Sequence, residues 1–97
     1  MILTFGNKLA KDLVEENPSK EARAFPPDLI RAARKKLAML HAARDLRDLA
    51  SPPGNRLERL KGAYREEYSI RINERWRIVF RFAGGNAEDV RVEDCHR

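Results

Sequence analysis

The chain has 97 residues, and its 20 lysines and arginines outnumber its 15 aspartates and glutamates, which gives a formal net charge of +5. This length suits one domain with its own hydrophobic core and is too short for separate catalytic and regulatory domains, so we expect residues 1–97 to form a single domain. The excess of basic over acidic residues favours a polyanion or an acidic protein as partner.

The single cysteine, Cys95, cannot form an internal disulfide and fits a reducing cytoplasm. The apolar residues 2–5 lack the basic start and the cleavage site of a signal peptide. No apolar run approaches the roughly 20 residues needed to cross a bilayer. We therefore expect a cytoplasmic protein without a membrane partner.

Two main helices are predicted in the first half of the chain. Residues 2–5 are predicted to form a short strand that ends in a Gly-Asn turn, and Asn7 can cap a helix over residues 8–16. A second helix is predicted over residues 28–44, after two prolines that suit a first helical turn. Its apolar stripe consists of Ile30, Ala33, Leu37 and Leu40.

The opposite face of this second helix carries Arg31, Arg34, Lys35 and Lys36. We interpret this basic run as a solvated helix face, in preference to a nucleic-acid contact, because long basic side chains commonly cover helix surfaces. His41 is interpreted as a surface residue that complements the helix dipole. Residues 45–50 are predicted to add one turn with Leu46 and Leu49 pointing inward, before residues 51–54 break the chain.

Residues 55–82 contain eight basic and four acidic residues, and apolar side chains alternate with arginines along them. This alternation predicts two strands whose even-numbered side chains are buried and whose odd-numbered arginines lie on an open face. Burying both apolar sets together requires an odd number of loop residues, and residues 73–75 supply three. The predicted pairs are Tyr68 with Phe80, Ile72 with Trp76, and Arg71 with Arg77.

The last hairpin is predicted to have a three-residue loop at residues 84–86, with Phe80 opposite Val90 and Ile78 opposite Val92 on the buried face. On the open face this register sets Arg81 against Asp89 and Arg77 against Glu93. Exposed ion pairs at these positions would neutralise part of the face. Arg81 is interpreted as mostly structural, whereas the role of Arg77 stays open, because Arg71 lies on its other side and leaves the local charge positive. Arg71 and Arg77 remain crowded, because two facing arginines are unfavourable unless an anion or a carboxylate lies between them.

Four blocks of the chain carry a resemblance to a known family. They are PPGNRLERLKG (52–62), YSIRIN (68–73), WRIVFRF (76–82) and DVRVEDCH (89–96). Together they resemble HigB-type toxins of the RelE/ParE superfamily, which belong to bacterial toxin–antitoxin systems. The likeness covers nearly the whole chain, including the PPDLIRAARKKLAMLHAA helix.

The resemblance implies an α+β, RelE-like fold with two N-terminal helices packed on a twisted, mainly antiparallel sheet of four to five strands. It implies a ribosome-dependent endoribonuclease that cleaves mRNA in the ribosomal A site, where the ribose 2′-hydroxyl attacks the neighbouring phosphate without a metal or other cofactor. It also implies a HigA-like helix-turn-helix antitoxin, through which alone the toxin would reach operator DNA.

The same resemblance suggests roles for individual residues. Lys61 and Arg77 match positions that hold the phosphate, and His96 is a candidate general acid or base. Asp94 can orient a base or help to bind the antitoxin. Candidate contacts to RNA are Arg71, Arg56, Arg75 and Cys95.

Two positions depart from the family pattern. Cys95 stands where relatives usually carry a tyrosine, and a thiol cannot stack on a base as an aromatic ring does. Glu58 stands where some relatives carry histidine, and its low reference pKa favours an ion-pair partner slightly over a general base. The residues alone do not choose between Glu58, Asp94 and His96 as proton acceptor. They also leave open a ParE-like inhibitor of a protein such as gyrase, or a catalytically silent member that binds antitoxin or RNA.

Overall fold

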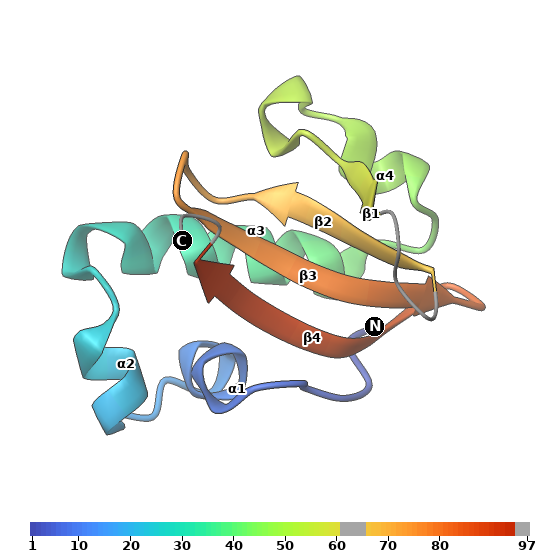
Figure 1. The fold of residues 1–97 in the computed structure, drawn as a ribbon. Coiled ribbons are helices and arrows are strands. Elements are labelled where there is room, and N and C mark those ends of the chain that lie inside the picture. Colours follow the sequence, from blue (N-terminus) through green and yellow to red (C-terminus); the bar gives the residue numbers. More distant parts are fainter. Residues whose placement is uncertain (61–65, 95–97) are drawn as a thin grey trace.

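The computed structural model describes residues 1–60 and 66–94, which form an α+β fold with helices that precede and cover one antiparallel sheet (Figure 1). The strands lie in the order β1-β2-β3-β4. In chain order the elements are α1 (Lys8–Glu15), α2 (Lys20–Ala24), the 3-10 turn η1 (Pro27–Leu29), α3 (Ile30–Ala42), α4 (Arg47–Ala50), η2 (Pro53–Asn55), β1 (Glu58–Leu60), β2 (Glu67–Arg71), β3 (Trp76–Ala83) and β4 (Asn86–Asp94). The α+β architecture predicted from the sequence is confirmed.

The hydrophobic core lies between the main helices and one face of the sheet. The predicted stripe of α3 is buried there through Ala33, Leu37 and Leu40. The predicted inward turn near residue 49 is α4, whose Leu49 is fully buried and whose neighbour Leu46 packs against the core. The strands contribute even-numbered residues to the same cluster, namely Ile70, Ile78, Phe80, Val90 and Val92.

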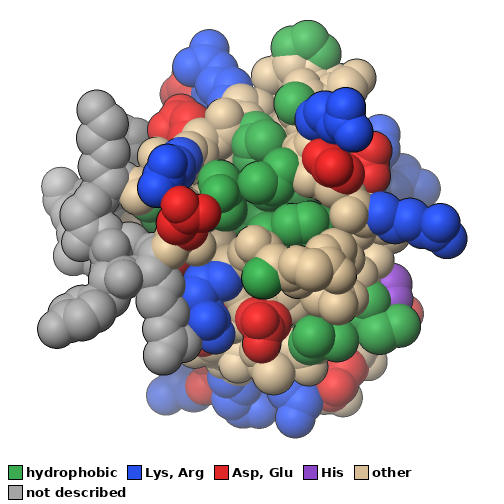
Figure 2. Space-filling model, turned by 90° about the vertical axis from the view of Figure 1, so that its right-hand side faces the viewer, with side chains coloured by type: hydrophobic (Ala, Val, Ile, Leu, Met, Phe, Trp, Pro, Cys, Tyr) green, Lys and Arg blue, Asp and Glu red, His purple; other side chains and the backbone are tan. Residues whose placement is uncertain are grey.

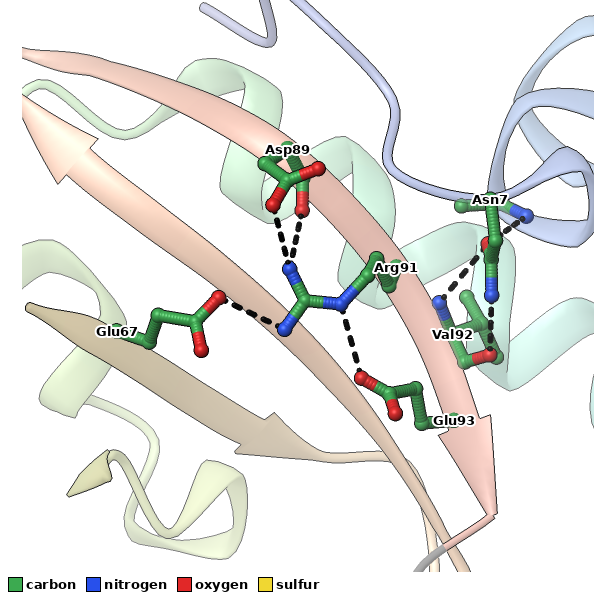
Figure 3. Close-up of polar contacts among 7 residues, drawn as sticks. Asn7, Glu67, Asp89, Arg91, Val92 and Glu93 are labelled. Carbon is green, nitrogen blue, oxygen red and sulfur yellow. Dashed lines mark hydrogen bonds and ion pairs between the residues drawn. The ribbon is translucent and has the colours of Figure 1, made fainter. Parts of the chain in front are cut away.

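Asn7 caps α1 as predicted and also ties that helix to the sheet. Its side-chain oxygen accepts a hydrogen bond from the backbone N–H of Ala10 at 3.0 Å. Its amide nitrogen donates to the carbonyl of Val92 in β4 at 3.0 Å, a contact visible at the right of Figure 3. One side chain therefore sets both the start of α1 and its position against β4.

The helix boundaries differ from the predicted ones in two places. The sequence analysis missed α2, which Ser19 caps by accepting a hydrogen bond from Ala22 N–H at 3.1 Å. This five-residue helix buries none of its side chains, so it has no apolar periodicity to detect. The second predicted helix begins with η1 and is helical over Ile30–Ala42.

In the described part of the chain, no helix is both long and apolar enough to cross a membrane.

The basic face of α3 is not simply solvated, which corrects our interpretation. Arg31 and Lys35 are exposed, but Arg34 donates to the carbonyl of Leu13 and pairs with Glu16 at 2.9 Å. Lys36 donates to the buried side chain of Asn55. Burial, and after it the neighbouring Lys35, lower the pKa of Lys36. Half of this basic run therefore anchors α3 to its neighbours.

The N-terminal segment follows the edge of β4 without forming the continuous strand predicted for residues 2–5. It makes two isolated parallel bridges, Ile2 with Ala87 and Phe5 with Val90. Between them the backbone N–H of Asp89 donates to the Thr4 hydroxyl at 2.8 Å, which interrupts the backbone ladder. The exposed His41 accepts a hydrogen bond from Ile2 N–H at 3.1 Å, so its role is to hold this segment on α3.

The register between β2 and β3 is the predicted one. Tyr68 lies opposite Phe80 and Arg71 opposite Arg77. The backbone N–H of Ile72 donates to the carbonyl of Trp76 at 2.9 Å, as a three-residue loop requires. The period of the strands and the parity of the loop were sufficient to predict this hairpin.

The register between β3 and β4 agrees with the prediction at one end only. Ile78 faces Val92 and Arg77 faces Glu93, but Arg81 faces Glu88 instead of Asp89. The turn has two residues, Gly84 and Gly85, both at positive φ, and a bulge between Val79 and Arg81 restores the parity. The predicted pair Phe80 and Val90 lies at this shift, with both side chains fully buried.

The two-residue turn predicts a stability cost for a side chain at Gly85. Its φ is +78°, and an added Cβ would lie 3.2 Å from the carbonyl oxygen of Arg44. Gly85→Ala is expected to lower the free energy of unfolding by about 1–2 kcal/mol, because a left-handed conformation is strained with a Cβ. Urea unfolding followed by circular dichroism measures this value. Gly54→Ala is the matched control, because its Cβ would meet nothing within 4 Å; equal losses in both variants would contradict the expectation.

Candidate functional site

The face of the sheet turned away from α1 and α3 carries a hollow of about 330 Å³. Its lining residues are Leu60, Glu67, Ser69, Arg77, Val79, Arg91, Glu93 and Asp94. Other hollows, of about 390 and 340 Å³, lie among α1, α2 and α3 and beside the N-terminal segment. Of these three hollows, the sheet hollow collects the predicted site residues Arg77 and Asp94 from β3 and β4, and it is our candidate site.

The positive charge of the chain is not gathered into one basic field on the side drawn in Figure 2. At that end of the sheet, Lys and Arg side chains lie beside Asp and Glu side chains around an apolar area (Figure 2). Strand arginines are also interleaved with carboxylates on the open face, where Arg77 faces Glu93 and Arg81 faces Glu88. Any anion-binding property must therefore come from local geometry, since opposite charges side by side cancel at a distance.

Arg77 lies at the centre of this face with its guanidinium held by two neutral oxygens. Its Nε donates to the hydroxyl of Ser69 at 2.9 Å, and its Nη2 donates to the carbonyl of Arg56 at 2.7 Å. The Ser69 side chain is fully buried and that of Arg77 is 17% exposed. These contacts fix the direction of the guanidinium without cancelling its charge.

Arg56 contributes its backbone to the site. Its φ of +44° is left-handed, and this conformation accompanies the hydrogen bond from Arg77 to its carbonyl oxygen. The preceding residue, Asn55, is fully buried and donates to the carbonyl of Leu49 at 3.1 Å, which holds the corner before β1 in place. The predicted contact of the exposed Arg56 side chain with RNA remains a prediction.

Arg71 and Arg77 face each other across β2 and β3, as predicted. The Arg71 side chain is 24% exposed, and its ion pair with Glu74 spans 4.0 Å to a carboxylate that is 90% exposed. So long and exposed a pair contributes little. Two facing cations whose carboxylate partners are long and exposed make this part of the described face a candidate place for an anion.

Glu58 borders Arg77 from β1. Its Oε1 lies 3.7 Å from Arg77 Nη2, and its side chain is 58% exposed. Register places Glu58 beside Ser69, on the same face as Arg77. This position suits an ion-pair partner of the arginine and also leaves a carboxylate oxygen next to any anion bound there.

Asp94 ends β4 opposite Trp76 and lines the hollow. Its Oδ2 accepts a hydrogen bond from Arg75 Nε at 2.8 Å, so Arg75 is joined to the end of β4. The remaining predicted site residues, Lys61, Cys95 and His96, lie outside the described residues. Within residues 1–60 and 66–94, no group of three His, Cys, Asp or Glu side chains is arranged to hold a metal ion.

Arg91, which the sequence analysis missed, binds three carboxylates on the open face (Figure 3). Nε donates to Glu93 at 2.9 Å, Nη1 to Asp89 at 2.8 Å, and Nη2 pairs with Glu67 at 2.8 Å. Burial lowers the pKa of Arg91, but hydrogen bonds to Glu93 and Glu67 outweigh it and raise that pKa. The alternation of acid, Arg91 and acid at residues 89, 91 and 93 was the available signal, since these three share one face of a strand.

The ion pair predicted between Arg81 and Asp89 is therefore wrong. Asp89 was predicted to pair with Arg81, and an ion pair between Glu93 and Arg77 was left open, but both carboxylates bind Arg91. The bulge removes Asp89 from its place opposite Arg81, and its φ is +55°. Glu93 has the predicted register and a different partner. The carboxylate that pairs with Arg77 is instead Glu58, at 3.7 Å.

Comparison with known proteins places the chain among toxins. The family model of the RelE-like toxin of type II toxin-antitoxin system HigB matches residues 3–96. The chain is 37% identical over 87 residues to Toxin HigB-1 of Vibrio cholerae, covering 90% of each protein. It is 31% identical over 69 residues to an uncharacterized protein of Haemophilus influenzae, covering 71% of this chain and 68% of that protein.

The contact between Ser69 and Arg77 can be tested through stability. Ser69→Ala leaves a largely buried charged N–H without its partner, which is expected to cost about 1–3 kcal/mol. A double-mutant cycle with Arg77→Met isolates the contact, because the second change removes the donor as well. We expect a coupling free energy of about 1 kcal/mol or more from chemical unfolding. Losses that simply add in the double variant would show that the hydroxyl does not hold the guanidinium.

Proposed function

Because the chain belongs to the HigB-like family of RelE-like toxins of type II toxin–antitoxin systems, we propose that it is an mRNA endoribonuclease that acts on the ribosome. The 2′-hydroxyl of a nucleotide in the A site attacks the adjacent phosphate, and the 5′-oxygen leaves. No metal or other cofactor takes part in the proposed reaction. The protein residues have to bind the phosphate, balance its growing negative charge and move two protons.

The facing arginines, Arg71 and Arg77, are the observation that carries this proposal. An anion between them removes the repulsion of two neighbouring cations. A guanidinium whose direction is fixed by Ser69 and Arg56 can offer its remaining N–H groups to phosphate oxygens. Charge that is oriented before the reaction stabilises the transition state without reorganisation. In this proposal Lys61 adds a second phosphate contact.

Three groups are candidates for proton transfer. Glu58 stands 3.7 Å from Arg77, and Asp94 lines the same hollow. Histidine is the residue type whose reference pKa, about 6.5, lies nearest to neutral pH, so His96 is the third candidate. We propose that one of these three takes the proton of the 2′-hydroxyl while another serves the leaving oxygen. Arg56 and Arg75 are proposed to contact the RNA backbone on either side.

As a member of a type II toxin–antitoxin family, the protein has an antitoxin as its partner. We propose that this antitoxin is a HigA-like helix-turn-helix protein, and that operator DNA is reached through it alone. Cys95 and Glu58, which depart from the family pattern, favour one further candidate function. In that alternative the protein binds its antitoxin or RNA but cleaves poorly.

The direct test of the proposal is to induce the chain alone and together with the neighbouring antitoxin gene. Growth arrest is expected in the first case and normal growth in the second. Primer extension on translated messages is expected to show discrete cuts during the arrest. Full arrest with intact messages would overturn the ribonuclease and favour a ParE-like inhibitor of a protein such as gyrase.

Arg77→Ala in the same assay tests the site. Cleavage is expected to fall by about 10²-fold or more, the usual loss when one oriented donor to a developing negative charge is removed. Antitoxin binding, measured by co-purification, should stay largely intact. Arg81→Ala is the matched control, because Arg81 lies on the same strand and face, opposite Glu67 and Glu88. Full cleavage by the Arg77 variant would remove it from the site.

Cys95→Tyr tests the poorly cleaving alternative. A tyrosine at this position offers an aromatic face on which a base can stack, worth about 1–3 kcal/mol per base. Under that alternative, cleavage measured on the same messages should rise by tenfold or more. Unchanged cleavage in a folded variant would show that the missing ring does not limit the enzyme.

A further inference from the structure

We propose that Arg91 is a positioning residue of the phosphate site: it binds the carboxylates of Glu67, Asp89 and Glu93, and so keeps Glu93 from pairing with Arg77. Among the described residues, Arg77 then keeps only its long ion pair with the exposed Glu58, at 3.7 Å, and its guanidinium is available to phosphate. The significance of this role for RNA rests on the proposed ribonuclease function. The competition of two arginines for one glutamate does not depend on that function.

Arg77 and Glu93 are directly opposite each other in β3 and β4. Side chains at such positions lie within contact distance, and an opposite-charge pair is favourable there. In the structure, however, Glu93 Oε1 accepts a hydrogen bond from Arg91 Nε at 2.9 Å. Arg77 Nε and Nη2 are directed to Ser69 and Arg56. Glu93 thus has two possible arginine partners, Arg77 opposite it in β3 and Arg91 on its own strand, and it binds Arg91.

Glu93 binds Arg91 and not Arg77 because the Arg91 guanidinium is already held in position by acceptors at its other nitrogens. Nη2 meets Glu67 from β2 at 2.8 Å, and Nη1 meets both the carboxylate and the carbonyl of Asp89. Arg91 and Glu67 are each 20% exposed, so solvent screens this pair less than a surface pair. Three carboxylates around one partly buried cation leave an excess of negative charge, and their contacts to Arg91 fix where these carboxylates lie in the lining of the hollow.

The N-terminal segment fixes Arg91 in this arrangement. Thr4 accepts the backbone N–H of Asp89 at the bulge, which aims the Asp89 carboxylate at Arg91. Gly6 lies against the arginine stem, because an added Cβ there would come within 2.5 Å of Arg91 Cγ and 2.4 Å of Asp89 Oδ1. A residue with a side chain at position 6 would displace the cluster. Arg91 is therefore packed in place from outside the sheet.

The experiment compares Arg91→Met with two double variants, Arg91→Met/Glu93→Gln and Arg91→Met/Glu67→Gln. Methionine keeps an apolar stem and removes the cation, so Glu93 becomes free to pair with Arg77. Binding is measured with a single-stranded 2′-O-methyl RNA, which cannot undergo 2′-hydroxyl attack, and cleavage with a translated message. Arg91→Met is expected to weaken both by about tenfold or more, the size expected for a charge-assisted hydrogen bond.

The double variant with Glu93→Gln is expected to recover most of this loss, because no carboxylate then competes for Arg77. The double variant with Glu67→Gln relieves the same amount of negative charge, but its carboxamide lies opposite Arg81, so recovery should be small. Equal recovery in both, or recovery in neither, would overturn the positioning role and leave Arg91 as a structural residue.

A second measurement does not need RNA. The NMR signal of the Arg77 Nε–H should move in Arg91→Met and return in the Glu93→Gln double variant; an unmoved signal would also overturn the proposal. If Arg91→Met does not fold, Arg91→Lys replaces it, because one ammonium cannot serve three carboxylates. A wild-type protein that neither binds nor cleaves RNA would refute the proposed function, while the NMR comparison would still decide the competition for Glu93.

Discussion

In the described residues, the helices pack on one face of the sheet and leave the other open (Figure 1), and this constraint determines the rest of the molecule. Successive side chains of a strand point to opposite faces, so burying Ile70, Ile78 and Val92 under α1 and α3 forces the neighbouring odd-numbered residues onto the open face. The core and the candidate site thus lie on opposite faces of the same strands, because buried and open residues alternate along each strand. A shift of one residue in register would place arginines in the core, which makes the arrangement strongly specified.

The open face then has to accommodate many charged groups in a small area. Arg91 and its three carboxylates form one cluster that is almost self-contained. Arg77 is instead oriented by a hydroxyl and a carbonyl, which carry no net charge. The result is a face of mixed charge on which the described ion pairs of Arg71 and Arg77 are long, at 4.0 Å to Glu74 and 3.7 Å to Glu58. Local compensation, and not the net charge of the chain, decides where an anion can bind.

Much of this arrangement follows from short-range rules. The cap at Asn7, the stripe of α3 and the pairing of Arg71 with Arg77 were all predicted, because each depends on residues a few positions apart or on the parity of a short loop. The helix α2 was missed because it buries nothing and leaves no pattern. The β3–β4 turn was predicted one residue too long, since a two-residue turn with a bulge and a three-residue turn give the same parity.

The sequence by itself thus determined the α+β class, the faces of the strands and the two arginines that face each other, because periodicity and loop parity are local properties. Tertiary structure alone decided which oxygen meets which arginine. The carbonyl of Arg56 reaches Arg77 from 21 positions away, and Glu67 reaches Arg91 from another strand. For each of these arginines, the chain contains several oxygen atoms of similar chemistry that could accept its hydrogen bonds. Only the folded geometry, which brings some acceptors within hydrogen-bond distance and keeps others out, makes that choice.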